Sequence, residues 1–172
     1  HTHNFTRLLV APITASVTVG NTIVETNLIS VSIPANTLST NNGILVRLHV
    51  SDFDQITSGA NNNCIFRLKY GATTLISSGI AEQAVTVANA SGYVIAELLA
   101  AGATNSQVGN LNALFHVSGV THTVDTYRDM EGSGTSVIDS TGAANIVISV
   151  EWQNADVGNT ITMNSAVLMI LD

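Results

Sequence analysis

The chain is dominated by segments in which apolar and polar side chains alternate with a period of two. This period places successive side chains on opposite faces of an extended strand, and so predicts β-structure with one apolar face. The clearest cases cover residues 29–33, 44–50, 64–70 and 146–152. In several of them the second face also carries an aliphatic side chain, at Leu45, Ile65 and Val147. We expect those strands to be covered on both sides, with another subunit as one of the covers.

Further extended segments lie between turn signals rich in Gly and Asn. Strands spaced by about ten residues with such turns are typical of a sandwich or barrel. They span residues 8–19, 73–80, 84–88, 92–99, 113–118, 122–127 and 160–171. Residues 94–101, VIAELLAA, fit a helix as well as a strand that runs into a bulge. The predicted fold class is all-β: a single antiparallel, jelly-roll-like β-sandwich of about 8–10 strands.

No linker or short repeat divides the chain, so we predict one β-sandwich domain over residues 7–172. Residues 1–6 are predicted to be an N-terminal arm or a processing remnant, because the chain begins at His1 without a methionine. The single cysteine, Cys64, alternates with apolar neighbours and is expected to be buried. With one cysteine, no intrachain disulfide is expected.

Charged residues make up only 10 % of the chain, and the net charge is −7 with 5 Lys and Arg. Nucleic-acid binding requires a basic stripe. The nearest candidate is Arg47 with Arg67 and Lys69 on one sheet face, and the simpler interpretation is three solvated strand residues. We therefore predict no nucleic-acid partner. The longest apolar run, residues 166–171, is too short to cross a bilayer, so no membrane partner is predicted.

The sequence offers two groups of side chains as candidate metal ligands. In the sequence SDFD, Phe53 is expected to face the core, which leaves Asp52 and Asp54 solvated at a strand end. His116 and His122 flank a turn but have no third ligand at metal-site spacing. We predict no metal site and no cofactor.

Catalytic residue types are present without a recognisable arrangement. His122, Asp125 and many serines offer the members of a triad, but the G-x-S-x-G elbow is absent. The sequence GSGTS at residues 132–136 is predicted to be a flexible loop. P-loop and Rossmann patterns are also absent. Carboxylates for a glycosidase exist, but nothing places a pair at the required separation. They are Glu97, Asp125, Asp129 and Glu151. We predict that the protein is not an enzyme.

The most irregular segment is YRDMEGSGTSVIDSTGAAN, residues 127–145. It is predicted to be a long hairpin loop or an arm that embraces a neighbouring subunit, and we favour the arm because little in the segment orders it alone. Loops held out by a sandwich are frequent binding sites. The candidate contacts to a partner protein or a host glycan are Tyr127, Arg128, Asp129 and Glu131.

The polar stretch IPANTLSTNNG is interpreted as the corner of the sandwich. Pro34 has no N–H and a fixed φ, so it suits the end of a strand. Asn36 and its neighbour are expected to hydrogen-bond the backbone of the turn, and Leu38 is expected to return to the core. Asn42-Gly43 is predicted to supply the positive φ that starts the next strand.

The same stretch carries a family resemblance. TNLISVSIPANTLSTNNGILVRLHV resembles virion structural proteins of tailed bacteriophages, in which a strand ends in I-P-A-N-T/S-L and a polar turn leads into the next strand. CIFRLKYGATTLISS resembles the strand that follows, and VISVEWQNADVGNTITMNSAVLMILD resembles the closing hairpin. Residues 81–143 do not match. The resemblance implies a jelly-roll-like sandwich, commonly a homotrimer, in a head decoration, head fibre or tail fibre protein.

The predicted function is a virion structural protein, a capsid decoration or fibre subunit that stabilises or ornaments the particle through oligomeric contacts. Its expected partners are further copies of itself and major capsid or other virion proteins. Little precedes Arg7, which favours a compact decoration protein or a cleaved tip over a full-length fibre. The alternative is a receptor- or carbohydrate-binding tip domain. For that role, Tyr93 and Tyr127 are the aromatics outside core-like alternation. The aromatics expected in the core are Phe66, Tyr70, Phe115 and Trp152.

Overall fold

The computed structural model describes residues 6–56, 63–80, 87–116 and 127–171, and the side chains of residues 6–11 and 127–129 lie outside its description. Within these ranges the chain forms eleven strands. They are β1 (Thr6–Ile13), β2 (Val17–Gly20), β3 (Thr26–Ile33), β4 (Gly43–Gln55), β5 (Cys64–Tyr70), β6 (Thr73–Ile80), β7 (Val87–Ala103), β8 (Ser106–His116), β9 (Tyr127–Ser136), β10 (Ala144–Trp152) and β11 (Thr160–Leu171). None of the helices that a membrane span would require is present in the described part of the chain.

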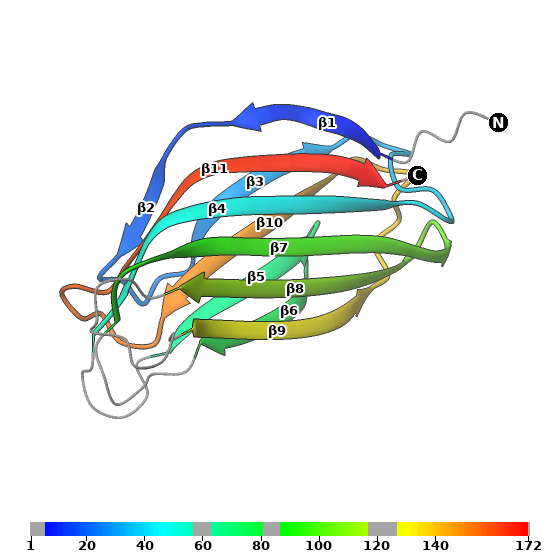
Figure 1. Cartoon of the computed structure of the whole chain (residues 1–172). Coiled ribbons are helices and arrows are strands. Elements are labelled where there is room, and N and C mark those ends of the chain that lie inside the picture. The colour runs from blue at the N-terminus through cyan, green and yellow to red at the C-terminus, as the bar shows by residue number, and fades with distance from the viewer. Residues whose placement is uncertain (1–5, 57–62, 81–86, 117–126, 172) are drawn as a thin grey trace.

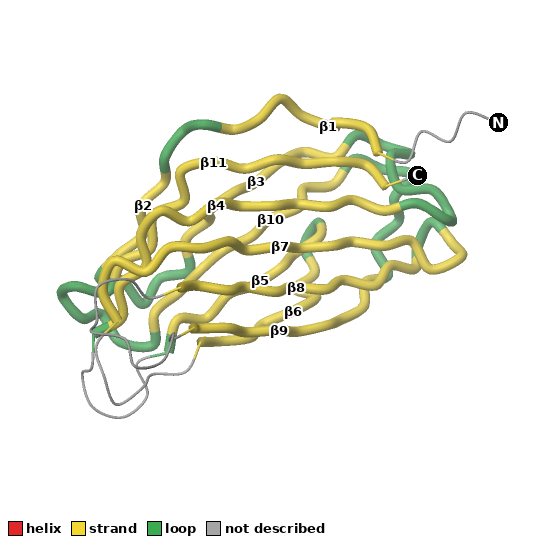
Figure 2. The backbone as a smooth tube through the Cα atoms, in the orientation of Figure 1, coloured by secondary structure: helices red, strands yellow, loops and turns green. Residues whose placement is uncertain are grey.

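The strands form two antiparallel sheets that lie face to face (Figures 1 and 2). The front sheet has the order β1-β11-β4-β7-β8-β9, with β2 also paired to β11. The back sheet has the order β3-β10-β5-β6. The chain passes repeatedly between the two sheets, which confirms the predicted jelly-roll-like, all-β sandwich with one strand more than the upper expected number. Thr6 pairs with Leu171, so the first strand begins beside the end of the last one.

The core lies between the sheets and is built by the alternation seen in the sequence. On β5 the side chains of Cys64, Phe66, Leu68 and Tyr70 are buried, as predicted, and those between them are half-buried. Phe53 of β4 stacks on Phe115 of β8, with ring centroids 4.6 Å apart. The Phe53 ring also stacks on Trp152 of β10, at 5.7 Å. The predicted core positions of the aromatics are therefore confirmed.

The two sheets are in close contact where the edge strand β9 lies on the edge strand β6. A Cβ atom on Gly134 would lie 1.8 Å from the backbone oxygen of Leu75, and one on Gly132 would lie 2.6 Å from Cγ2 of Ile76. The Ser78 hydroxyl donates to the Glu131 carbonyl at 3.1 Å. We call this contact the β6–β9 seam. Its glycines are required because the β9 backbone passes where side chains would stand.

The β6–β9 seam corrects the prediction of a loop or arm over residues 127–145. Residues 127–136 form β9, which pairs with β8 along its whole length, and GSGTS is part of that strand rather than a flexible loop. Only residues 137–143 lack regular structure in this segment. The sequence misled because Gly and Ser have low strand propensity, whereas here the close packing of β6 decides the conformation.

Other strand limits also differ from expectation. Residues 94–101 lie within β7, so the helical alternative is wrong, and the separately predicted strands 84–88 and 92–99 correspond to this one strand where described. The segment 8–19 is divided between β1 and β2. The predicted strand 122–127 lies outside the described residues except for its last residue. The strands expected over 73–80 and 160–171 match β6 and β11.

The turn between β3 and β4 is the predicted corner, with one change. Leu38 is fully buried, as expected. The left-handed residue is Asn36, with φ 62°, and not the Asn42-Gly43 pair. Asn42 instead holds the turn with its side chain, which accepts from the Ser39 N–H at 2.7 Å and donates to the Thr37 carbonyl at 2.8 Å. Gly43 is needed for space, because a Cβ atom there would lie 2.6 Å from Cδ2 of Leu99.

Candidate functional site

The outer face of the front sheet carries aliphatic side chains that no other layer of the described chain covers. Along β4 and β11 these residues alternate with fully buried ones, so they point away from the core. These side chains are half-buried. We call this set the apolar strip, and its members are Leu45, Leu99, Val108, Val167, Met169 and Leu171.

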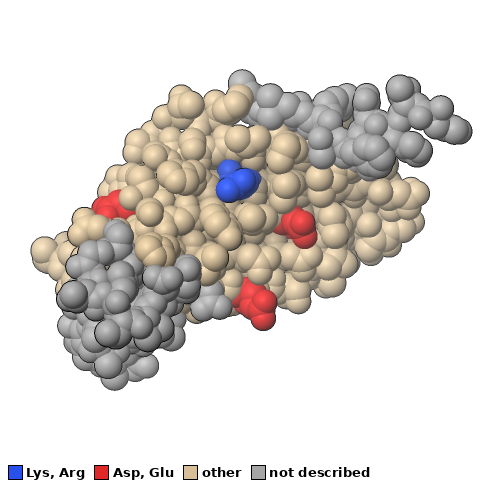
Figure 3. All heavy atoms as spheres, viewed as in Figure 1, with Lys and Arg blue, Asp and Glu red and all other residues tan. Residues whose placement is uncertain are grey.

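The strand register makes the apolar strip continuous. Leu171 pairs with Gly43, Gly43 with Leu99, and Leu99 with Val108, which gives one row across four strands. Met169 pairs with Leu45 in the next row. Figure 3 views this side of the molecule and shows mostly uncharged atoms, with isolated basic and acidic groups. Leu45 on β4 is one of the residues expected to be covered by another subunit, and that cover stays a prediction.

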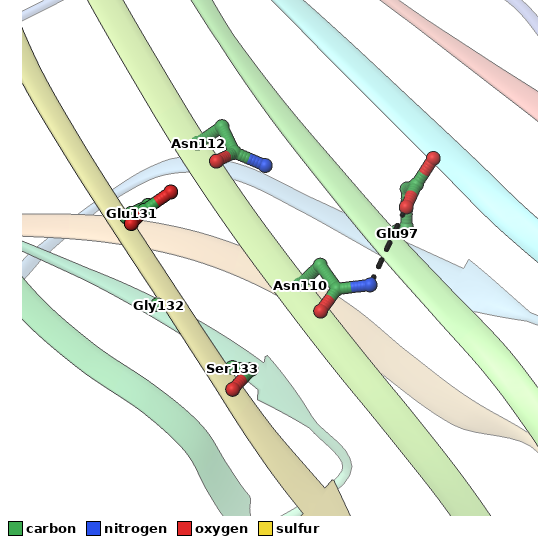
Figure 4. Close-up of a pocket in the computed structure, with 6 residues that line it drawn as sticks. All are labelled: Glu97, Asn110, Asn112, Glu131, Gly132 and Ser133. Carbon is green, nitrogen blue, oxygen red and sulfur yellow. Dashed lines mark hydrogen bonds between the residues drawn. The ribbon is translucent and has the colours of Figure 1, made fainter.

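Beside the apolar strip, the same face contains a polar hollow of about 520 Å³ (Figure 4). One hydrogen bond inside it is described: Nδ2 of Asn110 donates to Oε2 of Glu97 at 3.4 Å. The side chains that line it are carboxylates, amides and one hydroxyl, and no cation lines it among the described residues. The lining residues are Glu97, Asn110, Asn112, Glu131, Gly132 and Ser133.

Three neighbouring strands bring the members of the polar hollow together. Glu97 of β7 pairs with Asn110 of β8, which pairs with Ser133 of β9. In the adjoining row, Asn112 of β8 pairs with Glu131 of β9. Glu131 and Glu97 were considered from the sequence, the first as a loop residue and the second as a lone carboxylate. The amides were missed, although N-x-N in an alternating segment already indicates two amides on one face.

The four predicted contact residues all belong to β9 and not to a loop. The backbones of Tyr127, Arg128 and Asp129 pair with His116, Phe115 and Leu114, respectively, but their side chains lie outside the described part. Glu131 is the member whose side chain is described. It is exposed and lines the polar hollow. The role of Glu131 as a contact residue therefore stays a prediction, and the polar hollow is the place where such a contact would form.

Arg47 does not share a face with Arg67 and Lys69, so the candidate basic stripe is not formed. Arg47 lies on the front sheet, where its guanidinium carbon is 5.5 Å from the ring centroid of Tyr93. Arg67 and Lys69 lie on β5 of the back sheet.

On the back sheet, Arg67 and Lys69 belong to a charged network with Glu25 and Glu151. Nη1 of Arg67 donates to Oε2 of Glu151 at 2.9 Å, and Lys69 pairs with Glu25. Glu25 also accepts from the Ser149 hydroxyl at 2.5 Å. The hydrogen bond from Lys69 and then that from Ser149 lower the pKa of Glu25.

The residues considered as metal ligands are engaged in the fold. Asp52 and Asp54 lie in the last four residues of β4, which ends at Gln55, and Phe53 is fully buried as predicted. The two aspartates are half-buried rather than fully solvated. Asp54 accepts from the Asn89 N–H at 2.5 Å and from the Thr160 hydroxyl at 3.3 Å. Burial and then the neighbouring charge of Asp54 raise the pKa of Asp52.

No group of three metal-ligating side chains gathers within the described ranges. His116 lies at the end of β8, whereas His122 lies outside the described residues. The absence of a metal site therefore stays a prediction.

Comparison with known proteins gave only distant likenesses. No family model and no curated protein matches the chain. The CBM2 module of the evolved Dit of Lactobacillus casei BL23 phage J-1 is 14% identical, with 81% of this chain and 67% of that one covered and a TM-score of 0.36. Lectin II from Ulex europaeus is 8% identical, with 92% and 99% covered and a TM-score of 0.40.

A capsid protein is among the likenesses. The infectious bursal disease virus VP2 subviral particle is 13% identical over 97% of this chain, which spans 32% of the VP2 chain, with a TM-score of 0.35. Because these TM-scores are below 0.5, the likenesses carry no argument about what this chain does. Its role has to be inferred from its own surfaces.

Proposed function

We propose that this chain is a virion structural protein, a capsid decoration or fibre subunit that packs through the front sheet against further copies of itself. The observation that carries the proposal is the apolar strip. Aliphatic side chains in a contiguous row on an outer sheet face are typical of an interaction surface rather than of a freely solvated one. Charged residues, which would oppose such packing, make up only 10 % of the chain.

A homotrimer on the virion is the assembly we propose. A closed symmetric oligomer buries the same patch on every subunit and leaves no open surface for further growth. The resemblance of residues 26–50, 64–78 and 147–172 to virion proteins of tailed bacteriophages favours this assembly and a major capsid or other virion protein as the further partner. The net charge of −7 opposes contact with nucleic acid.

We also propose that the chain has no catalytic role. Glu97 and Glu131 are the carboxylates of the polar hollow, and β8 lies between their strands. Two strand spacings separate the backbones by about 10 Å, which is wider than the roughly 5 Å between the carboxyl groups of a retaining glycosidase. Of the other candidates, His122, Asp125 and the side chain of Asp129 lie outside the described residues, and Glu151 is paired with Arg67 on the back sheet.

The mass of the protein in solution tests the structural role. Light scattering of the whole chain is expected to give about three times the subunit mass of 17.9 kDa. Met169→Lys places a charge within the apolar strip and should shift the mass toward that of the monomer. Ser30→Lys, at an exposed position on the back sheet, is the matched control and should leave the mass unchanged. Circular dichroism checks that both variants fold.

Location on the particle is the second arm of the test. Antibodies against the protein, coupled to gold, are expected to bind purified virions at regular positions. A monomer at every concentration, together with unlabelled particles, would overturn the proposal.

A further inference from the structure

We propose that the polar hollow is a binding site for a neutral saccharide. This goes beyond the structural role, because it assigns a ligand to a part of the front sheet that the apolar strip does not use. The strip lies mainly over β11 and β4, whereas the hollow lies over β7, β8 and β9.

The size of the polar hollow favours an organic ligand over a metal ion. Its volume of about 520 Å³ lies in the range of small-molecule sites. A metal ion needs its ligands within about 2.5 Å, but the strands of Glu97 and Glu131 are about 10 Å apart across the sheet. The two carboxylates therefore suit opposite sides of one ligand the size of a sugar ring.

The lining groups match a polyhydroxylated molecule. The carboxylates of Glu97 and Glu131 accept hydrogen bonds, and each hydroxyl of a sugar has a proton to donate. The amides of Asn110 and Asn112 both donate and accept, as a hydroxyl does, so they pair with sugar oxygens in either sense. In Figure 4 these side chains and that of Ser133 stand on three neighbouring strands, with the Asn110 amide directed toward Glu97.

The charge of the polar hollow selects against acidic sugars. Two carboxylates line it, and within the described part no Lys or Arg does. A sialic acid or uronic acid would bring a third carboxylate into the site with no cation to balance it, which is unfavourable at short range. A neutral hexose, N-acetylhexosamine or deoxyhexose meets no such repulsion.

The setting of the polar hollow also suits a sugar ring. The residue that follows Asn112 on the same face of β8 is Leu114, which is aliphatic and is not a member of the apolar strip. It offers an apolar surface to the C–H groups of the ring. The polar groups stand on paired strands, and the β6–β9 seam fixes the outermost one, so little ordering is required on binding.

A glycan array is the first test. The whole chain is applied to neutral oligosaccharides that end in glucose, galactose, mannose, N-acetylglucosamine or rhamnose, and to sialylated and uronic acid counterparts. Binding to neutral probes and not to acidic ones is expected. Preference for the acidic probes would overturn the proposal.

The second test locates the ligand. Millimolar methyl glycosides of the same neutral sugars are titrated while the side-chain amide resonances of Asn110 and Asn112 are followed by NMR. At least one sugar should shift both. If no array probe binds and no glycoside shifts these resonances, the proposal is wrong. Shifts produced by calcium or by a lysine peptide, and by no sugar, would also overturn it.

Variants separate this site from the structural role. Asn110→Ala and Glu131→Gln should each weaken binding about 10-fold, since each removes or weakens one hydrogen-bonding partner of the ligand. Asn145→Ala, at an exposed position on the back sheet, is the control and should bind as the wild type does. The variants should keep the oligomeric mass of the wild type, so failure of saccharide binding and failure of assembly are read separately. Unchanged binding in both hollow variants would overturn the assignment.

Discussion

The two outer faces of the sandwich differ in how their side chains are covered. On the back sheet, the charged network of Glu25, Arg67, Lys69 and Glu151 lies across the strands, and beneath it Ser149 is fully buried although it belongs to an outer face. On the front sheet, the apolar strip and the polar hollow have no such cover among the described residues. The back face is sealed by its own long side chains, whereas the front face leaves both apolar and polar groups open to a partner.

This difference explains why the chain needs few charged residues to cover the apolar surface of its outer faces. Long charged side chains cover apolar surface with their stems and keep their ends in water. The chain places both described cations of the back sheet in this role. On the front sheet, Arg47 lies over Tyr93 and leaves the strip uncovered. A surface that a partner covers does not need this protection.

The difference between the two outer faces requires the two sheets to stay packed together. Gly134→Ala tests this packing at the β6–β9 seam. The new Cβ atom would lie 1.8 Å from the Leu75 carbonyl, so the β9 backbone would have to leave β6. We expect a loss of about 3 kcal/mol or more in the free energy of unfolding, measured by urea denaturation. Gly142→Ala is the control, because its Cβ would meet only the Asp139 carbonyl, at 3.8 Å. Equal stability of the two variants would contradict the close contact at the seam.

Arg67→Met tests whether the back face is sealed by its charges. Glu151 would lose its 2.9 Å partner, and Glu25 would lose a second nearby cation. We expect a loss of about 1–2 kcal/mol in the free energy of unfolding. Arg47→Met on the front sheet, where the side chain is exposed, should cost about 0.5 kcal/mol. Similar costs at the two positions would remove the distinction between the faces.

The pH dependence of stability sharpens the same distinction. The pKa of Glu25 lies below its ordinary value of 4.5, chiefly because Lys69 donates to it. A carboxyl with a lowered folded pKa stabilises the fold above the unfolded pKa, and this contribution is lost as the pH falls through the folded value. Thermal melts below pH 4.5 should therefore show a decline worth about 0.5 kcal/mol. The decline should be weaker in both Glu25→Gln and Lys69→Met, and an unchanged decline would contradict this origin.

Ionisation of Asp52, on the front sheet, should affect stability in the opposite sense to ionisation of Glu25. Burial and the charge of Asp54 raise its pKa above 3.8, so the ionised form destabilises the fold at neutral pH. Asp52→Asn is expected to raise stability by about 0.3 kcal/mol at pH 7, and this gain should vanish as the pH falls below 3.8. Asp54→Asn should instead destabilise, because Asp54 accepts from Asn89 and Thr160. A destabilised Asp52→Asn would contradict this interpretation.

Much of the fold could be predicted because burial and alternation coincide. The strands β6 and β11 and the buried positions of Cys64, Phe66 and Trp152 follow from a period of two. The predictions that failed concern segments whose conformation depends on contacts with distant parts of the chain. β9 looked like a loop because Gly132 and Gly134 have no strand preference of their own, and only the nearby β6 backbone explains them. Two glycines spaced by two residues are, in retrospect, a signal of close approach.

The candidate site was less accessible to sequence reasoning than the fold. Glu97, Asn110 and Glu131 are neighbours only because β7, β8 and β9 pair in one register. A shift of one residue in either ladder would turn one of these side chains toward the core. Register depends on the whole sheet, so no local pattern could have united these residues.

The pairing of the first strand with the last has a mechanical consequence. Thr6 lies opposite Leu171, and the ladder between β1 and β11 is interrupted by register shifts at Leu8/Val10 and Val10/Ile13. Tension applied between these two ends would act along the hydrogen bonds, which run across antiparallel strands, and would open them one after another. A load passed through both ends would therefore peel β1 away at low force. The rest of the sandwich would stay folded to higher force, so β1 would be the first strand to detach under load.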